Sequence, residues 1–149
     1  MTTGRLARTL RALLRQKQGS VVTEFALLAP TILALMLGVL QIGIGMQNYN
    51  AMRSVASDVM RYAVVNYQTG NELTNDQIRF YLRSIAIKSP YKLESARLAI
   101  SVTNVIDPRI DGTVEKTVTM TYSIPTVLSF IGVDAFPITY TQPLFLMES

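Results

Sequence analysis

The pattern of apolar and polar positions begins with a long stretch that carries no charge. Phe25 to Met46 is a run of 22 residues without a charged side chain. As an α-helix rising ~1.5 Å per residue it would extend about 33 Å, which matches a hydrocarbon core of ~30 Å. The run therefore predicts a membrane-spanning helix, although a buried helix of a soluble protein can be equally apolar. Pro30 removes one backbone donor and predicts a kink near the start of the span.

The helical pattern continues beyond this apolar run. No Gly or Pro interrupts the sequence between Met46 and Thr69. We therefore predict one continuous helix from about Ser20 to Gln68, ended by Thr69-Gly70-Asn71. Apolar residues recur at three- and four-residue steps and define one face of its outer half: Met46, Tyr49, Met52, Val55, Ala56, Val59, Met60, Ala63 and Val64.

A second, shorter amphipathic helix follows. Thr74 and Gln77 have the spacing of a capping box, in which each side chain accepts a hydrogen bond from the other residue's backbone N–H. The helix runs on through Ile78 and Leu82, and Ser89-Pro90 ends it.

The period then changes to two residues, which is typical of strands. Apolar side chains alternate with polar ones in the segments 98–102 and 114–124, on either side of a loop at Asp107–Gly112. A third extended segment, 136–147, contains Pro137 and Pro143, which confine it to a sheet edge. The fold class is α+β, a long helix whose outer half packs on a small antiparallel sheet. About 80 residues beyond the helix, without disulfides, need that helix to complete a core.

The net charge of +4 is unevenly distributed. Residues 1–19 carry five bases and no acid, whereas the other 130 residues carry nine bases and ten acids. The body is therefore nearly neutral, which argues against a nucleic-acid partner, since such binders carry their bases on the folded surface.

Composition also limits the chemistry. The sequence has no Cys and no His, so it offers no thiolate, no imidazole base and no disulfide framework. No acidic cluster has the spacing of a calcium loop, and Tyr, Ser, Thr and acids form no nucleophile-base set. We expect no enzyme activity, no cofactor and no metal site.

The flanking charges predict the orientation of the span. Five bases precede it, and only Arg53 and Arg61 follow it closely. By the positive-inside rule the N-terminus is cytoplasmic and the body is translocated. We therefore divide the chain into a basic leader (1–19), a transmembrane segment (20–46) and an extracytoplasmic α+β domain (47–149). A removable secretory signal, cut near Gly43-Ile44-Gly45, stays an alternative, but its apolar region is typically only 7–15 residues long.

Glu24 is the only charged residue between Lys17 and Arg53. An acid at the centre of a membrane helix costs roughly 2.5–3.5 kcal/mol on insertion scales, and less near the interface. A charge in this position suggests a function. It lies five residues after Gly19, which closes the basic leader, and is followed at once by Phe25.

Together, the basic leader, Gly19, Glu24, Phe25 and the span that follows resemble the class III signal of type IV prepilins. From Gly19 to Gly45 the sequence is most similar to TadE/TadF-like pseudopilins of tight-adherence (Flp) pilus systems. The resemblance implies a pilin-like fold and a bacterial inner-membrane protein with a periplasmic domain. It implies a minor pilin or pseudopilin that helps to assemble or initiate a pilus. The partners so implied are a prepilin peptidase, the major Flp pilin, other minor pilins, the inner-membrane assembly platform and membrane lipid.

The resemblance also implies roles for individual residues. The peptidase would cut between Gly19 and Ser20, and glycine would ease the approach of the backbone to the enzyme. The new ammonium on Ser20 would pair with Glu24 of an adjacent subunit. The same pair could form within one chain, since the residues are four apart on a helix. The alternative is an uncleaved, single-pass signal-anchored subunit of another envelope complex, with Glu24 in the membrane interface.

Overall fold

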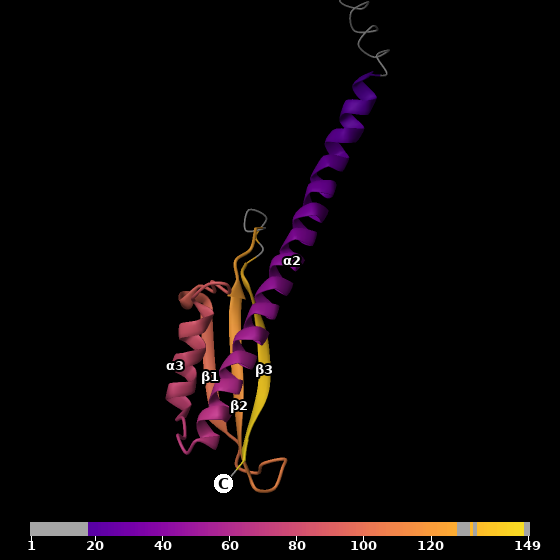
Figure 1. Ribbon diagram of the computed structural model, residues 1–149. Coiled ribbons are helices and arrows are strands. Elements are labelled where there is room, and N and C mark those ends of the chain that lie inside the picture. Colours follow the sequence, from indigo (N-terminus) through magenta and orange to yellow (C-terminus); the bar gives the residue numbers. More distant parts are fainter. Residues whose placement is uncertain (1–17, 128–131, 133, 148–149) are drawn as a thin grey trace, which may run out of the picture. The chain divides into compact units, whose positions relative to one another are not determined.

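The computed structural model describes residues 18–127, 132 and 134–147 (Figure 1). The bases of the predicted leader, Arg5 to Lys17, lie outside these residues. The chain divides into two compact units, Met1–Leu40 and Gln41–Ser149. The described part of the first unit is a helix, and the second unit holds the remaining elements.

The first helix, α2 (Gln18–Gln68), is continuous over 51 residues and includes Pro30. Gly70, with φ of +77°, adopts a left-handed conformation that favours glycine and ends the helix. Its N–H donates to the carbonyl of Tyr67, and the N–H of Asn71 to that of Asn66, both at 3.0 Å. These bonds satisfy carbonyl groups at the helix end, and the helix predicted from Ser20 to Gln68 is confirmed.

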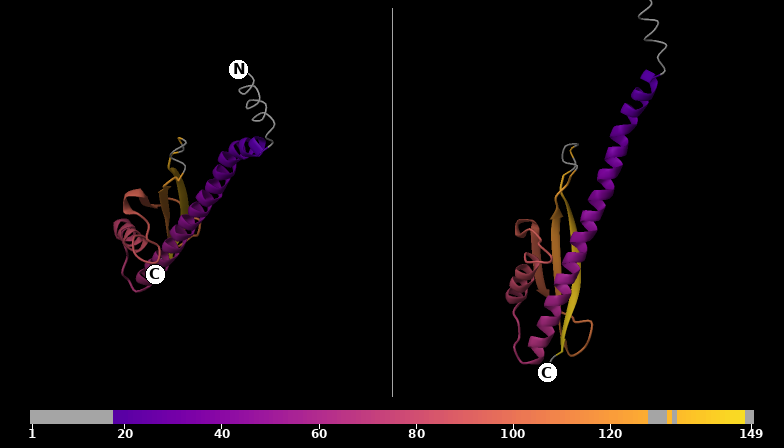
Figure 2. Two further views of the ribbon diagram at one scale, coloured as in Figure 1. Left: turned by 90° about the horizontal axis from the view of Figure 1, so that it is seen from above. Right: turned by 45° about the horizontal axis from the view of Figure 1, so that its top comes forward.

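The second helix, α3 (Asn75–Ala86), begins with the predicted capping box. The Thr74 hydroxyl accepts a hydrogen bond from the Gln77 N–H at 3.2 Å, and Gln77 Oε1 accepts one from the Thr74 N–H at 2.8 Å. Ile78 and Leu82 are fully buried on one face. Figures 1 and 2 show α3 lying along strand β1 (Leu98–Asn104).

A single 3₁₀ turn, η1 (Ser95–Arg97), leads into β1, which is followed by β2 (Thr113–Ile124) and β3 (Phe136–Met147). The three strands form an antiparallel sheet in the order β1-β2-β3. The position of β3 at an edge confirms the prediction made from its two prolines. Proline lacks a ladder donor and is tolerated where one side of the strand has no neighbour.

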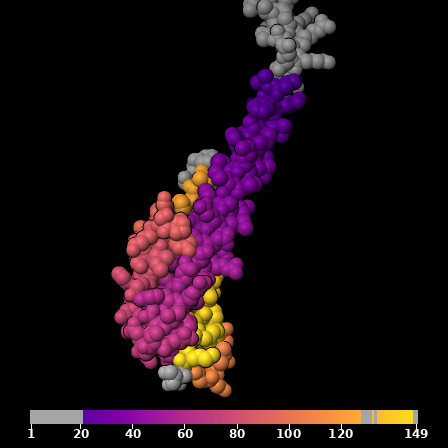
Figure 3. Space-filling model, viewed as in Figure 1, coloured from indigo at the N-terminus to yellow at the C-terminus, as the bar shows by residue number. Residues whose placement is uncertain are grey.

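The core of the Gln41–Ser149 unit lies between the helices and one face of the sheet. Val118, Met120 and Ile124 of β2 are fully buried on this face. In Figure 3 the helical layer hides most of the sheet, and β3 shows along one side. The helix residues buried in this core belong to the predicted apolar face: Met52, Val55, Ala56, Val59, Met60 and Ala63.

Two members of the predicted helix face lie outside this core. Met46 is 63% exposed and Tyr49 is 41% exposed. Tyr49 instead makes an edge-to-face contact with Tyr140 of β3, with ring centroids 5.6 Å apart. The buried face of α2 therefore excludes Met46, because the helix meets the sheet at this turn through Ile44, which packs against the core, and Gly45, where a Cβ would lie 3.3 Å from Ile124.

The opposite face of the sheet is rich in hydroxyl side chains. Two pairs face each other across β2 and β3, with Thr119 and Thr141 oxygens 3.4 Å apart and those of Thr121 and Thr139 3.1 Å apart. Alternation of Thr and Ser with core residues along β2 thus separates a polar face from a buried one.

Candidate processing and membrane-insertion site

The first part of α2 presents apolar side chains to its surroundings. Val21, Phe25 and Leu27 are exposed by 66%, 67% and 79%. The helix contains an 18-residue window with a mean hydropathy of 2.2, and 6% of that window is buried. Among the described residues, this is the one helix long and apolar enough to cross a membrane. A single N-terminal apolar helix of this kind suggests a single-pass membrane anchor.

Gly19 and Ser20, the predicted cleavage residues, are helical and belong to α2. The Gly19–Ser20 peptide bond therefore lies in helical backbone, just before the exposed apolar side chains that begin at Val21.

Glu24 and Phe25, the predicted assembly residues, follow on the same helix, and both are exposed. Ser20 and Glu24 are four residues apart on α2, so they lie on the same side about one turn apart. The helix thus brings Glu24 next to the position of the amine that cleavage would create.

The side chain of Gln41 makes two hydrogen bonds that the sequence pattern did not predict. The residue is 5% exposed. Nε2 donates to the carbonyl of Pro125 at 3.1 Å, and Oε1 accepts from the N–H of Val127 at 2.9 Å. The nitrogen and the oxygen of the amide are therefore both hydrogen-bonded. These two bonds join α2 to the segment after β2. The sequence does mark this position, since Gln41 is the only residue with an amide side chain in the run from Phe25 to Met46.

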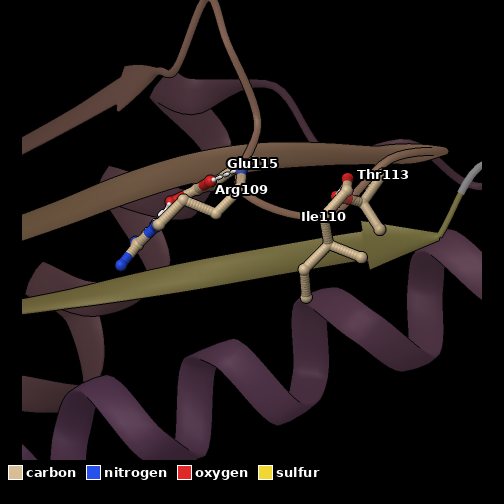
Figure 4. A network of polar contacts seen from close by, with 4 residues as sticks. All are labelled: Arg109, Ile110, Thr113 and Glu115. Carbon is tan, nitrogen blue, oxygen red and sulfur yellow. Dashed lines mark hydrogen bonds and ion pairs between the residues drawn. The ribbon is translucent and has the colours of Figure 1, made fainter.

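A second polar cluster closes the loop between β1 and β2 (Figure 4). Glu115 accepts hydrogen bonds from the backbone N–H and the Nε of Arg109, both at 2.7 Å, and from Nη2 of the same side chain. The Glu115 side chain is 1% exposed. The Arg109 guanidinium and N–H hold the pKa of Glu115 below its usual range. Thr113 donates to the Ile110 carbonyl at 2.7 Å and pins the same loop.

Lys116 joins β2 to the connection between the helices. Its Nζ donates to the Leu73 carbonyl at 3.2 Å and to Asn75 Oδ1 at 2.9 Å. Burial lowers the pKa of Lys116, and the nearby Glu72 acts in the opposite direction. The lysine therefore supports the position of α3 over the sheet.

A polar depression of about 420 Å³ lies along the outer half of α2. There the Tyr91 hydroxyl donates to Asp58 Oδ2 at 2.9 Å, which raises the pKa of Tyr91. Within the part of the chain that the structure describes, no group of three or more acidic residues is placed to hold a metal ion. This surface displays hydrogen-bonding side chains of α2 and Tyr91.

The chain belongs to the α+β class, with a long apolar N-terminal helix and a small three-stranded antiparallel sheet. Residues 19–61 match the family model described as TadE-like protein, which confirms the resemblance to TadE-like proteins over that stretch. The match begins at Gly19 and ends within α2, so α3 and the sheet lie outside it. No curated protein and no solved structure matches the chain.

Proposed function

We propose that the chain is a minor pilin or pseudopilin of a Tad/Flp-type pilus, anchored in the bacterial inner membrane. The observation that carries this proposal is the TadE-like match over residues 19–61, which points to a Tad pilus-associated protein at the family level. The long apolar helix and the small α+β domain support a structural subunit rather than an enzyme. The partners follow from the family: a prepilin peptidase, the major Flp pilin, other minor pilins and the assembly platform.

The proposed processing step is hydrolysis of the Gly19–Ser20 peptide bond on the cytoplasmic side. Water adds across the bond, the leader keeps the new carboxylate on Gly19, and Ser20 gains an ammonium. Glycine before the bond supports the step, since no Cβ obstructs the approach of the backbone to the peptidase. The ammonium then pairs with Glu24, either in a neighbouring subunit or in the same chain.

Co-expression with a Tad prepilin peptidase tests the proposal. We expect N-terminal sequencing and intact mass to show a chain that begins at Ser20. Gly19→Leu should block cleavage, because the side chain obstructs the approach of the backbone to the peptidase. A Leu substitution at Gln18 is the matched control on the leader side of the bond.

A chain that keeps its leader in the presence of an active peptidase would contradict the processing step. That result would favour the uncleaved signal-anchored subunit. Failure to co-purify with Tad pilus components would contradict the assembly role separately.

A further inference from the structure

An apolar groove of about 320 Å³ lies at the end of the Gln41–Ser149 unit where α2 enters it. Ile42, Met46 and Tyr49 of α2 form one wall, and Phe136 and Ile138 at the start of β3 form the other. We propose that this groove lies in the outer interface of the lipid bilayer and contacts lipid acyl chains. The domain would then be partly embedded in the membrane. The inference rests on the membrane anchor of the proposed function and not on cleavage after Gly19.

The length of helix available for the membrane supports this placement. Gln41 is fixed inside the domain by its two hydrogen bonds to the segment after β2. With Glu24 at the level of the headgroups, the span before Gln41 is Phe25 to Leu40, 16 residues, which extend about 24 Å as a helix and fall ~6 Å short of a ~30 Å hydrocarbon core. The next turn of α2 must supply the difference or the bilayer must thin. That turn already belongs to the domain.

The surface at this end is suited to lipid. Ile42 is 64% exposed, Met46 63% and Phe136 39%. Val127, whose N–H is held by Gln41, is also exposed. Among the residues that the structure describes, no charged side chain lines the groove. Ile42 and Met46 follow the exposed apolar residues of the span directly along α2.

Asp134 sets a limit to the depth. It is exposed and lies two residues before Phe136. A carboxylate is costly in hydrocarbon and stable among headgroups. The groove therefore belongs at the boundary between headgroups and acyl chains, where interfacial elements typically sit ~5–10 Å deep. A second copy of the chain in the groove would leave the shortfall in helix length unexplained, so lipid is the occupant we favour.

The absence of Trp from the sequence allows a direct test with single-Trp variants. The full chain is placed at one copy per nanodisc, in phosphatidylcholine with or without bromine on the acyl chains. Bromine quenches Trp fluorescence only on contact. We expect Phe136→Trp to lose most of its fluorescence in the brominated lipid. Leu33→Trp reports the span, and Phe80→Trp on α3, 69% exposed and near the opposite edge of the sheet, should be unaffected.

The outcomes separate the possible occupants. Quenching of Leu33→Trp without quenching of Phe136→Trp would overturn the embedded groove and leave the anchor intact. Quenching of neither would overturn the anchor and the proposed function with it. If the fluorescence of Phe136→Trp is quenched with one chain per disc but not with two, the groove would be assigned to a second copy. If Phe136→Trp disturbs the fold, Ile42→Trp gives the same test from the α2 wall.

Discussion

At the scale of single residues, two glutamates occupy opposite settings. Glu24 is exposed on an apolar helix, whereas Glu115 is almost fully buried and receives three hydrogen bonds from Arg109. A carboxylate held in this way stabilises its own loop. Glu24, on the apolar part of α2, is the carboxylate that we propose to pair with the Ser20 ammonium. The two residues therefore support predictions of different kinds.

Replacement of Glu24 by Leu should affect assembly rather than insertion. Loss of the carboxylate removes a cost of placing charge near the bilayer, so the variant should insert at least as well as the wild type. Co-purification with the major Flp pilin should fall, because the Ser20 ammonium loses its partner. Thr31→Leu, which removes a neutral polar group from the same helix, should leave co-purification unchanged. Normal assembly of the Glu24→Leu chain would refute the assembly role of Glu24.

Glu115 should make the stability of the domain depend on pH. Its pKa in the folded state is depressed by Arg109, so its contribution is present above the unfolded value of about 4.3 and is lost as the pH falls through the folded pKa. Glu115→Gln should therefore be less stable than the wild type at neutral pH, and the difference should shrink on acidification. Urea unfolding at a series of pH values measures this.

Glu94→Gln is the control for that series. Glu94 pairs with Arg97 at an exposed site, at 2.7 Å, where an ion pair contributes ~0–1 kcal/mol. Its stability should follow that of the wild type. A Glu115→Gln chain whose stability is lower than wild type by a constant amount at all pH values would contradict the titration of Glu115.

At the scale of the elements, α2 serves two environments in succession. Its first part exposes apolar side chains, and its outer half supplies six buried residues to the domain core. The three-stranded sheet has one apolar face, and a face of this kind must pack against another layer. The outer half of α2 and α3 together form that layer.

Val59→Asp should destabilise the domain by on the order of 4 kcal/mol, because it places an unpaired charge in the core. Val59 is fully buried in α2. Val65→Asp, on the same helix but 54% exposed, should change stability by only ~0.5 kcal/mol. Urea unfolding of both full-length variants in detergent provides the comparison. Equal stability of the two would show that the core does not depend on α2.

Fragments offer an independent measure of the same dependence. A fragment beginning at Tyr49 keeps every fully buried residue of α2 and should unfold cooperatively. One beginning at Gly70 leaves the apolar face of the sheet open and should not fold. Cooperative unfolding of the Gly70 fragment would instead indicate a self-sufficient sheet domain to which α2 is only a tether.

At the scale of the whole molecule, the distribution of charge predicts topology. The bases that precede the span outnumber those that closely follow it by five to two. Residues 47–149 should therefore lie outside the cytoplasm. A reporter active only in the cytoplasm should be silent when fused after Ser149 and active when fused after Lys17. Strong activity of the Ser149 fusion would contradict both the orientation and the proposed function.

The sequence by itself determined the elements of this protein and much of their order. Helices and strands follow from the spacing of apolar residues along the chain, and the capping box at Thr74 and the prolines of β3 act through their immediate neighbours. The cleavage and assembly residues were likewise proposed from local sequence, because Gly19, Glu24 and Phe25 form a short motif.

Only the tertiary structure decided which side chains meet across long distances in the sequence. Gln41 binds groups 84 and 86 positions away, and Lys116 reaches the connection between the helices from β2. Periodicity assigned Met46 to the core-facing side of α2, but Ile44 and Gly45 face the sheet at that turn and Met46 is 63% exposed. A pattern along the chain specifies which face of an element is apolar. Which residues of that face are covered depends on the lengths and packing of the elements that lie against it, and these are set in three dimensions.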